Sequence, residues 1–166
     1  MTAISNLTAS RGPYEKDVVV IAASAVAVSC AADTAENVLA TITIPAGIMG
    51  LNGRLRITTN WSYTNSANAK TARTRFSGVA GTAYQSSAIT TQANSEHVTH
   101  IQNRGAPNSQ YGYSQGIANT TGVFATAQQS GAVDTTVATT VVISGQKASA
   151  GETMTLESYL VELVYV

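Results

Sequence analysis

The segment 96–100 holds two histidines and a carboxylate and is the first candidate for chemistry in the chain. Glu96, His97 and His100 have side chains of the types that bind metal ions. On a strand, however, residues three positions apart point to opposite faces of the sheet. Both imidazoles could reach one ion only if the strand carried a bulge. We therefore expect two strand histidines here, and we expect no metal and no cofactor.

Catalytic groups are equally hard to assemble. The chain lacks the Gly-x-Ser-x-Gly motif that presents a nucleophilic serine, and Cys30 ends an apolar run, where a thiol behaves as a small hydrophobe. Glu152 and Glu162 share a strand face, but about ten residues at roughly 3.3 Å each place them about 33 Å apart. That separation exceeds the spacing of glycosidase carboxylates. Pairing in three dimensions with Asp134 or Glu96 stays open, and we expect no enzymatic activity.

Four arginines form the basic cluster of the sequence, at Arg54, Arg56, Arg73 and Arg75. If their strands were adjacent, the four side chains could merge into one patch. The aromatic residues nearby fall on the opposite face of the first strand, which weakens any nucleic-acid site. Because arginine is suited to bidentate pairing, we expect a solvated face or one buried between subunits, and no nucleic-acid partner.

A tyrosine-rich segment, residues 108–116, also contains Gln, Ser and Gly. Such a composition suits adaptable contact loops, because tyrosine supplies contact area at low entropic cost. We predict an exposed recognition loop with Tyr111, Tyr113 and Gln115, and group Tyr84 with these exposed aromatics. A plain surface loop is the alternative.

The composition limits what these residues can do. The chain has 166 residues, 9 Lys plus Arg and 9 Asp plus Glu, so its formal charge is zero and only 11% of residues are charged. An ordinary soluble domain has about 25%. Long-range capture of nucleic acid or an anionic membrane is excluded by this balance, and disorder is disfavoured by 44% hydrophobic residues. A neutral chain has little colloidal protection, which indicates a protein that works inside an assembly.

The elements that must position these residues are strands. Residues 1–17 carry Gly12-Pro13 and no periodicity, and we predict an extended N-terminal arm. From residue 18 onward Thr and Val dominate the predicted strand runs, and both favour strands. The most apolar stretch, 18–28, is too short to span a bilayer, so we expect no membrane partner. The predicted strands are 18–29, 37–44, 53–64, 69–77, 83–91, 95–103, 119–127, 135–144 and 153–165.

The fold class follows from this strand count. Alternation is clearest in 53–64, where Leu55, Ile57 and Trp61 share one face and Arg54 and Arg56 the other. Eight or nine short strands with Gly-rich turns predict an all-β, antiparallel β-sandwich. Among such folds the jelly roll fits the length best. We predict the arm at 1–17 and one β-sandwich (jelly-roll) domain at 18–166.

Several short blocks follow one another in the chain over about residues 37–165. They are LATITIPAGIMGLNGRLRI (39–57), WSYTNSANAK (61–70), RFSG (75–78), IQNR (101–104), DTT (134–136), ISGQ (143–146) and TLESYLVEL (155–163). In this fixed order they resemble blocks of tailed-bacteriophage virion structural proteins with a jelly-roll fold, which are capsid cement or decoration proteins, head-fibre-like proteins and tail-fibre-like proteins. The resemblance implies a virion part without catalysis.

From this resemblance and the low charge we expect a cement protein that binds the assembled phage head and stabilises capsid subunit junctions. It would be made in the host cytoplasm and lie on the capsid surface of the virion, and its partners would be sister copies (a homodimer or homotrimer) and the major capsid protein. The candidate contacts are Arg11, Pro13, Tyr14, Arg54, Arg56, Arg73 and Arg75.

Two alternatives stay open. One is a head- or tail-fibre protein that binds a host receptor through the tyrosine-rich segment. The other is a carbohydrate-active enzyme or lectin, which would need two converging carboxylates or a calcium cage.

Overall fold

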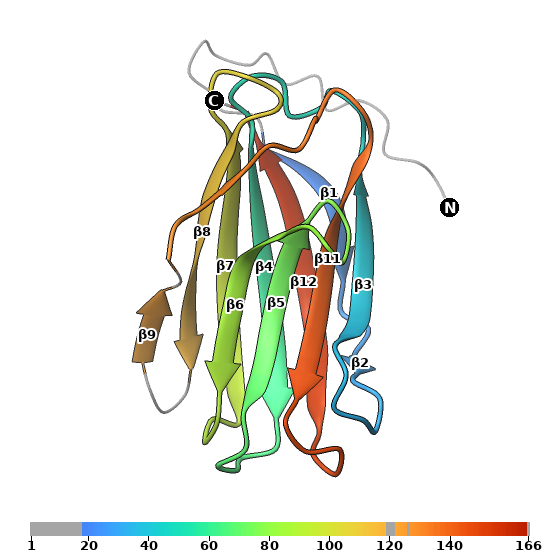
Figure 1. Cartoon of the computed structure of the whole chain (residues 1–166), viewed down its shortest axis with the longest axis vertical. Coiled ribbons are helices and arrows are strands. Elements are labelled where there is room, and N and C mark those ends of the chain that lie inside the picture. Colours follow the sequence, from blue (N-terminus) through green and yellow to red (C-terminus); the bar gives the residue numbers. More distant parts are fainter. Residues whose placement is uncertain (1–17, 119–121, 126, 166) are drawn as a thin grey trace, which may run out of the picture.

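The computed structural model describes residues 18–118, 122–125 and 127–165 (Figure 1). The predicted arm, with Arg11, Pro13 and Tyr14, lies outside the described residues. Every regular element in the described ranges is a β-strand. No helix long and apolar enough to cross a membrane occurs in this part of the chain.

The strands form two antiparallel sheets. The eight-stranded sheet has the order β1-β12-β4-β7-β8-β10, with β2 also paired to β12 and β9 to β8, and the four-stranded sheet has the order β3-β11-β5-β6. The strands of the first sheet are β1 (Val18–Ser24), β2 (Val28–Ser29), β4 (Arg54–Tyr63), β7 (Asn94–Asn103), β8 (Gln110–Ala118), β9 (Gly122–Ala125), β10 (Gln129–Gly131) and β12 (Met154–Val164). The strands of the second sheet are β3 (Asn37–Ile44), β5 (Lys70–Phe76), β6 (Thr82–Ile89) and β11 (Thr139–Lys147).

This strand order is that of a jelly roll. The chain crosses between the sheets so that β1-β12-β4-β7 faces β3-β11-β5-β6, which is the interleaved order of two Greek keys. Strands β8, β9 and β10 are inserted between β7 and β11 and widen the first sheet beyond the four strands that the basic fold has in each sheet. Figure 1 shows β8 and β9 on the side of this sheet away from β1. The prediction of an all-β, antiparallel jelly-roll sandwich is confirmed.

Alternating side chains build the core between the sheets. Leu55, Ile57 and Trp61 point inward from β4 and are buried, whereas Arg54 and Arg56 point outward, as the alternation predicts. The opposite sheet contributes Phe76 and Val141, both without exposed surface. Further buried apolar residues are Ile42, Ile44, Met49, Tyr63, Ala72, Ile89, Ile101, Ile143, Met154, Leu156, Val161 and Leu163.

The other half of the interior, where β5 and β6 cover β7 and β8, is polar. Some of its buried side chains pair with one another: the Thr74 hydroxyl donates to Gln85 Oε1 at 2.8 Å, and the Thr99 hydroxyl donates to the Ser114 Oγ at 3.2 Å. Ser95 shares a 2.8 Å hydrogen bond with the Tyr63 hydroxyl. Buried hydroxyls and amides are tolerated when they are paired in this way.

Several predicted strand boundaries were wrong. The strand predicted at 18–29 is interrupted after Ser24, whose Oγ accepts from the backbone N–H of Val26 at 3.1 Å, although both halves pair with β12. The strand predicted at 135–144 begins only at Thr139, because the Asp134 carboxylate accepts from the Thr136 backbone N–H at 2.9 Å and forms a turn. Of the strand predicted at 119–127, the described part is β9.

Candidate functional site: the outer faces of the two sheets

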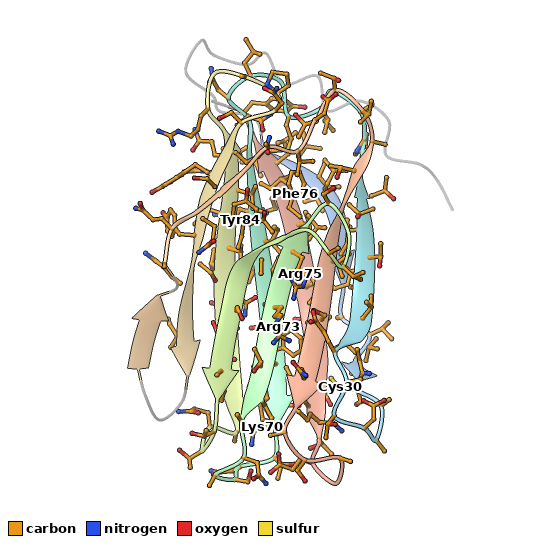
Figure 2. All side chains as sticks on the ribbon, viewed as in Figure 1. Cys30, Lys70, Arg73, Arg75, Phe76 and Tyr84 are labelled. Atoms are coloured by element: carbon orange, nitrogen blue, oxygen red, sulfur yellow. The ribbon has the colours of Figure 1, made fainter. Side chains whose placement is uncertain are left out.

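The four arginines do not form one patch, because their two strands are not adjacent. Arg54 and Arg56 lie on the outer face of β4 in the eight-stranded sheet, whereas Arg73 and Arg75 lie on the outer face of β5 in the four-stranded sheet. Figure 2 shows Arg73 and Arg75 on the sheet that faces the viewer. The jelly-roll crossover between β4 and β5 separates the pairs, since consecutive strands here belong to opposite sheets.

On the four-stranded sheet a single carboxylate holds both arginines. Arg75 donates to Glu36 from Nε at 3.0 Å and from Nη2 at 3.1 Å, and Arg73 Nη1 lies 3.3 Å from the same carboxylate. The Ser144 hydroxyl donates to it at 2.6 Å. The hydrogen bonds from Arg75 lower the pKa of Glu36 most, with Ser144 and Arg73 adding to the effect against the opposing effect of burial. This face is therefore internally paired.

The predicted recognition loop at 108–116 is a strand, so its prediction as a loop was wrong. In β8, Tyr111, Tyr113 and Gln115 face outward, and Gly112 and Gly116 face the interior. The inward positions are glycine or polar, so no apolar alternation indicated a strand. The two tyrosines are half-buried on the sheet surface and Gln115 is exposed.

Tyr84, which we predicted to be exposed, is fully buried, and its burial explains the glycines of β8 and β10. A Cβ at Gly112 would lie 2.6 Å from Tyr84 Cδ1 and 2.1 Å from the His100 carbonyl oxygen. A Cβ at Gly131 would lie 2.4 Å from the Tyr84 hydroxyl. Figure 2 shows Tyr84 between β6 and the inserted strands. Side chains at these two positions would push the insertion off the sandwich.

The outer face of the eight-stranded sheet gathers a second set of residues, here called the basic-aromatic face: Arg54, Arg56, His100, Arg104, Tyr111 and Tyr113. Strand register creates it. One cross-strand row is Glu162–Arg56–His100–Tyr113, and the next is Val164–Arg54–Gln102–Tyr111. Residues in one row are direct neighbours on the sheet surface.

The rings and cations of this face are in contact. The His100 and Tyr113 rings lie 5.2 Å apart, the Tyr111 and Tyr113 rings 6.4 Å apart, and the Arg104 guanidinium carbon 5.3 Å from the centre of the Tyr111 ring. Burial lowers the pKa of His100, and the charges of Arg54 and Arg56 lower it further. His100 is therefore neutral near pH 7, and the charge of the face comes from its arginines.

One carboxylate reaches this face within the described ranges. Arg56 donates from Nε to Glu162 at 2.7 Å, and its Nη2 lies 2.6 Å from the same oxygen. Arg54 and Arg104 form no ion pair with any described carboxylate. Three arginines and one glutamate leave the basic-aromatic face with a net charge of +2.

A buried polar network fixes the loop that carries Arg104. Asn103 donates from Nδ2 to the Gly50 carbonyl at 2.7 Å and to the Thr135 hydroxyl at 2.9 Å. Gln110 donates to Asn103 Oδ1 at 2.8 Å, and the Thr135 hydroxyl donates to the Pro107 carbonyl at 2.8 Å. Sequence reasoning missed these positioning residues. The signal available in the sequence was the amide side chain of Asn103, which occupies the same inward-facing side of its strand as an apolar residue.

The histidines lie as strand alternation predicts. His97 points into the sandwich and is fully buried, and His100 points outward. Among the described residues, no group of three His, Cys, Asp or Glu side chains is placed to hold a metal ion. A cavity of about 380 Å³ opens at the opposite end of this sheet, and a part of its lining is Asn60, Trp61 and Glu96.

The carboxylates considered for catalysis have separate partners. Glu152 lies 3.6 Å from the buried Lys70 ammonium and accepts from the Asn68 amide at 3.1 Å, whereas Glu162 binds Arg56. The Asp134 carboxylate accepts a hydrogen bond from the Thr136 hydroxyl within its own turn.

One side of the sandwich is an exposed apolar edge. Strands β1 and β2 form an edge of one sheet and β3 an edge of the other, and they lie on the same side of the molecule (Figure 1). Val26 on this side is 74% exposed. The valine edge comprises the exposed residues Val18, Val19, Val20, Val26, Val28 and Val38.

No protein-family model matches the chain, and no curated protein matches its sequence. Among solved structures, it is similar to a chain of infectious bursal disease virus, Gx strain (10% identity, 91% of this chain, 32% of that chain, TM-score 0.42). It is also similar to a Lotus tetragonolobus seed lectin (7% identity, 94% and 96% coverage, TM-score 0.41) and to an infectious bursal disease virus VP2 subviral particle (12%, 91% and 32%, TM-score 0.39). The chain spans about a third of the two viral chains. At these scores the function must be argued from the surfaces of this chain.

Proposed function

We propose that this protein is a non-catalytic virion structural protein, a cement or decoration protein that binds the assembled phage head as a homo-oligomer. In this role it stabilises the junctions between capsid subunits. The resemblance of residues 37–165 to phage virion proteins is one of the grounds for this proposal. A jelly roll by itself carries no function, so the support has to come from the surface.

The observation that carries the proposal is the valine edge. Residues 18–29 contain no charged side chain, and neither does β3. Proteins ordinarily protect exposed strand edges with charges, prolines or bulges, because an open apolar edge pairs with other chains. The pairing of β1 shifts register between Val20 and Ala22, and the pairing of β3 shifts opposite Ile143 and Ser144, but neither edge strand has a charge or a proline. An edge strand with a run of exposed valines and no charge is suited to being covered by another chain. A sister copy or a shell subunit would provide that cover.

The low charge of the whole chain supports the same role. Surface hydroxyls and amides cost much less to desolvate than ions, so a surface rich in Thr, Ser and Asn can enter contacts cheaply. Binding to the assembled shell and not to free subunits stabilises the shell by about 2.7 kcal/mol per site at a hundredfold excess over Kd. Repeated over many sites, such a gain resists heat and pressure.

The test is to add purified protein to phage heads that lack it and to measure the temperature at which the heads release their contents. Wild-type protein should raise that temperature. Val20→Lys places a charge on the valine edge and should abolish the effect, whereas Val79→Lys is the matched control, because these valines are 57% and 59% exposed. Unchanged heads with wild-type protein, or full activity of Val20→Lys, would contradict the proposal.

A fibre or receptor-binding role is the alternative, and the inserted strands β8–β10 favour it because they present two tyrosines on an outer face. Under this alternative the protein binds host cells and leaves the stability of the heads unchanged. The same preparations therefore separate the two roles.

A further inference from the structure

We infer that the basic-aromatic face is the surface that docks on the shell, and that its arginines bind carboxylates of an acidic protein surface. The inference rests on the proposed function, since it assigns a face and a partner chemistry to that role. It also extends the predicted contacts to Arg104, Tyr111 and Tyr113, which belong to the same face.

The first argument is unmatched charge. Glu162 neutralises Arg56 through contacts of 2.7 and 2.6 Å, which leaves Arg54 and Arg104 without a carboxylate among the described residues. Arg104 is exposed and Arg54 is partly exposed, so the carboxylate oxygens of a partner can pair with these two side chains.

The second argument is comparison with the other sheet. Arg73 and Arg75 have the same spacing on their strand as Arg54 and Arg56, but Glu36 occupies both of them. Their guanidinium groups are used inside the molecule. The carboxylates of a partner can therefore pair more readily with the arginines of the eight-stranded sheet than with those of the four-stranded sheet.

The third argument is the type and the shape of the surface. Arginine and tyrosine are among the residues enriched in binding hot spots, and the stacking of Arg104 on Tyr111 holds the guanidinium in place. The face is the outer surface of three neighbouring strands, β4, β7 and β8. Sites for small ligands are concave. A broad strand surface instead suits a protein partner, whose interface would bury about 800 Å² on each side. These features favour protein carboxylates over an acidic polysaccharide.

The hydrogen-bond network beneath Arg104 holds this part of the surface in a fixed conformation. Asn103 and Gln110 fix both ends of the loop that carries Arg104, through bonds of 2.7–2.9 Å to Gly50, Thr135 and each other. A contact group that is already held in position loses little entropy on binding. The loop is thereby pre-organised for a partner.

The experiment compares two double variants of the full chain. Arg54→Gln with Arg104→Gln removes the unmatched charges, and Arg73→Gln with Arg75→Gln is the control, with the same change in net charge on the opposite face. Circular dichroism first verifies that each variant is folded. In the head-binding assay at about 0.1 M salt, we expect the first variant to lose about tenfold or more in affinity, the size of a hot-spot loss, and the control to change by less than about threefold. Equal losses in both variants would overturn the inference.

A second arm uses soluble probes, poly-L-glutamate and polygalacturonate, with binding measured by fluorescence anisotropy. We expect poly-L-glutamate to bind the wild type and the control, and to bind the first variant about tenfold more weakly. Preference for polygalacturonate would overturn the inference in favour of a polysaccharide, and no binding of either probe would also overturn it. If the wild type binds poly-L-glutamate through Arg54 and Arg104 but does not bind heads, the proposed function fails and the carboxylate chemistry of the face is supported.

Discussion

The outer faces of the two sheets start from the same sequence pattern and use it differently. Each presents two arginines separated by one residue on a central strand, Arg54 and Arg56 on β4 and Arg73 and Arg75 on β5. On the four-stranded sheet Glu36 pairs with both arginines. On the eight-stranded sheet Glu162 pairs with one of them, and the inserted strand β8 adds two tyrosines to the same face.

The difference shows how little the local pattern decides. Glu36 is 39 residues from Arg75 in the chain, and Glu162 is 106 residues from Arg56, so neither pairing is visible in the local sequence. Strand order brings these carboxylates to their arginines. A structural arginine pair and a contact surface therefore differ in how many arginines the one carboxylate on each face can pair with.

The largest expected effect comes from breaking the wide sheet at its inserted strands. Gly112→Ala places a Cβ 2.1 Å from the His100 carbonyl oxygen and 2.6 Å from the Tyr84 ring. Because backbone must move to relieve such a contact, we expect a loss of about 3 kcal/mol or more in the free energy of unfolding, together with the loss of carboxylate binding. Gly151→Ala is the control, since a Cβ there meets nothing within 4 Å. Denaturant unfolding measures both variants, and similar midpoints would refute the packing argument.

Acid should affect the eight-stranded sheet before the Glu36 cluster. Burial lowers the pKa of His97 from 6.5 to about 4, so the unfolded chain binds its proton more readily than the folded one. Stability contributed by the neutral imidazole is complete above pH 6.5 and is lost as the pH falls to about 4, up to about 3 kcal/mol. The pKa of Glu36 is lowered from 4.5, so its contribution is lost only below that pH. Urea unfolding at a series of pH values measures both losses.

The variant His97→Gln should remove the loss between pH 6.5 and 4. An unchanged slope in this range would show that another group causes the acid sensitivity. His100, whose pKa is also lowered, is the group to replace next.

The sequence predicted the sandwich well, because alternation in β4 and the turn residues are local signals. It failed where local signals were absent or misleading. Strand β8 has glycine and hydroxyl side chains on its inner face, so its hydrophobic period is missing. Tyr84 and Tyr111 are the same residue type in similar polar surroundings, and only the packing of β6 against β8 across the sandwich places one inside and the other outside. The four arginines are divided between two faces for the same reason, because neighbouring strands in the chain belong to different sheets.

A substitution with a smaller effect on stability should give the four-stranded sheet the unpaired arginines that the eight-stranded sheet has. Glu36→Gln removes the carboxylate that pairs with Arg73 and Arg75, at a cost of about 1 kcal/mol, since the ion pairs are partly exposed. We expect the four-stranded sheet to gain poly-L-glutamate binding. Adding Arg73→Gln and Arg75→Gln to Glu36→Gln should abolish that gain. Binding that persists in the triple variant would place the new site elsewhere.

A substitution at Tyr111 should cause the smallest change in stability and still cause a clear change in binding. Tyr111→Ser removes a half-buried ring on the sheet surface and its contact with Arg104, worth about 0.5–1 kcal/mol. Tyr84→Ser is the matched control, because it removes a fully buried ring and should cost about 3 kcal/mol or more. We expect poly-L-glutamate affinity to fall severalfold with Tyr111→Ser while the unfolding midpoint changes little. If Tyr111→Ser instead destabilised the chain as much as Tyr84→Ser and left binding unchanged, the tyrosines of β8 would belong to the fold, and the difference between the two outer faces would reduce to their carboxylates.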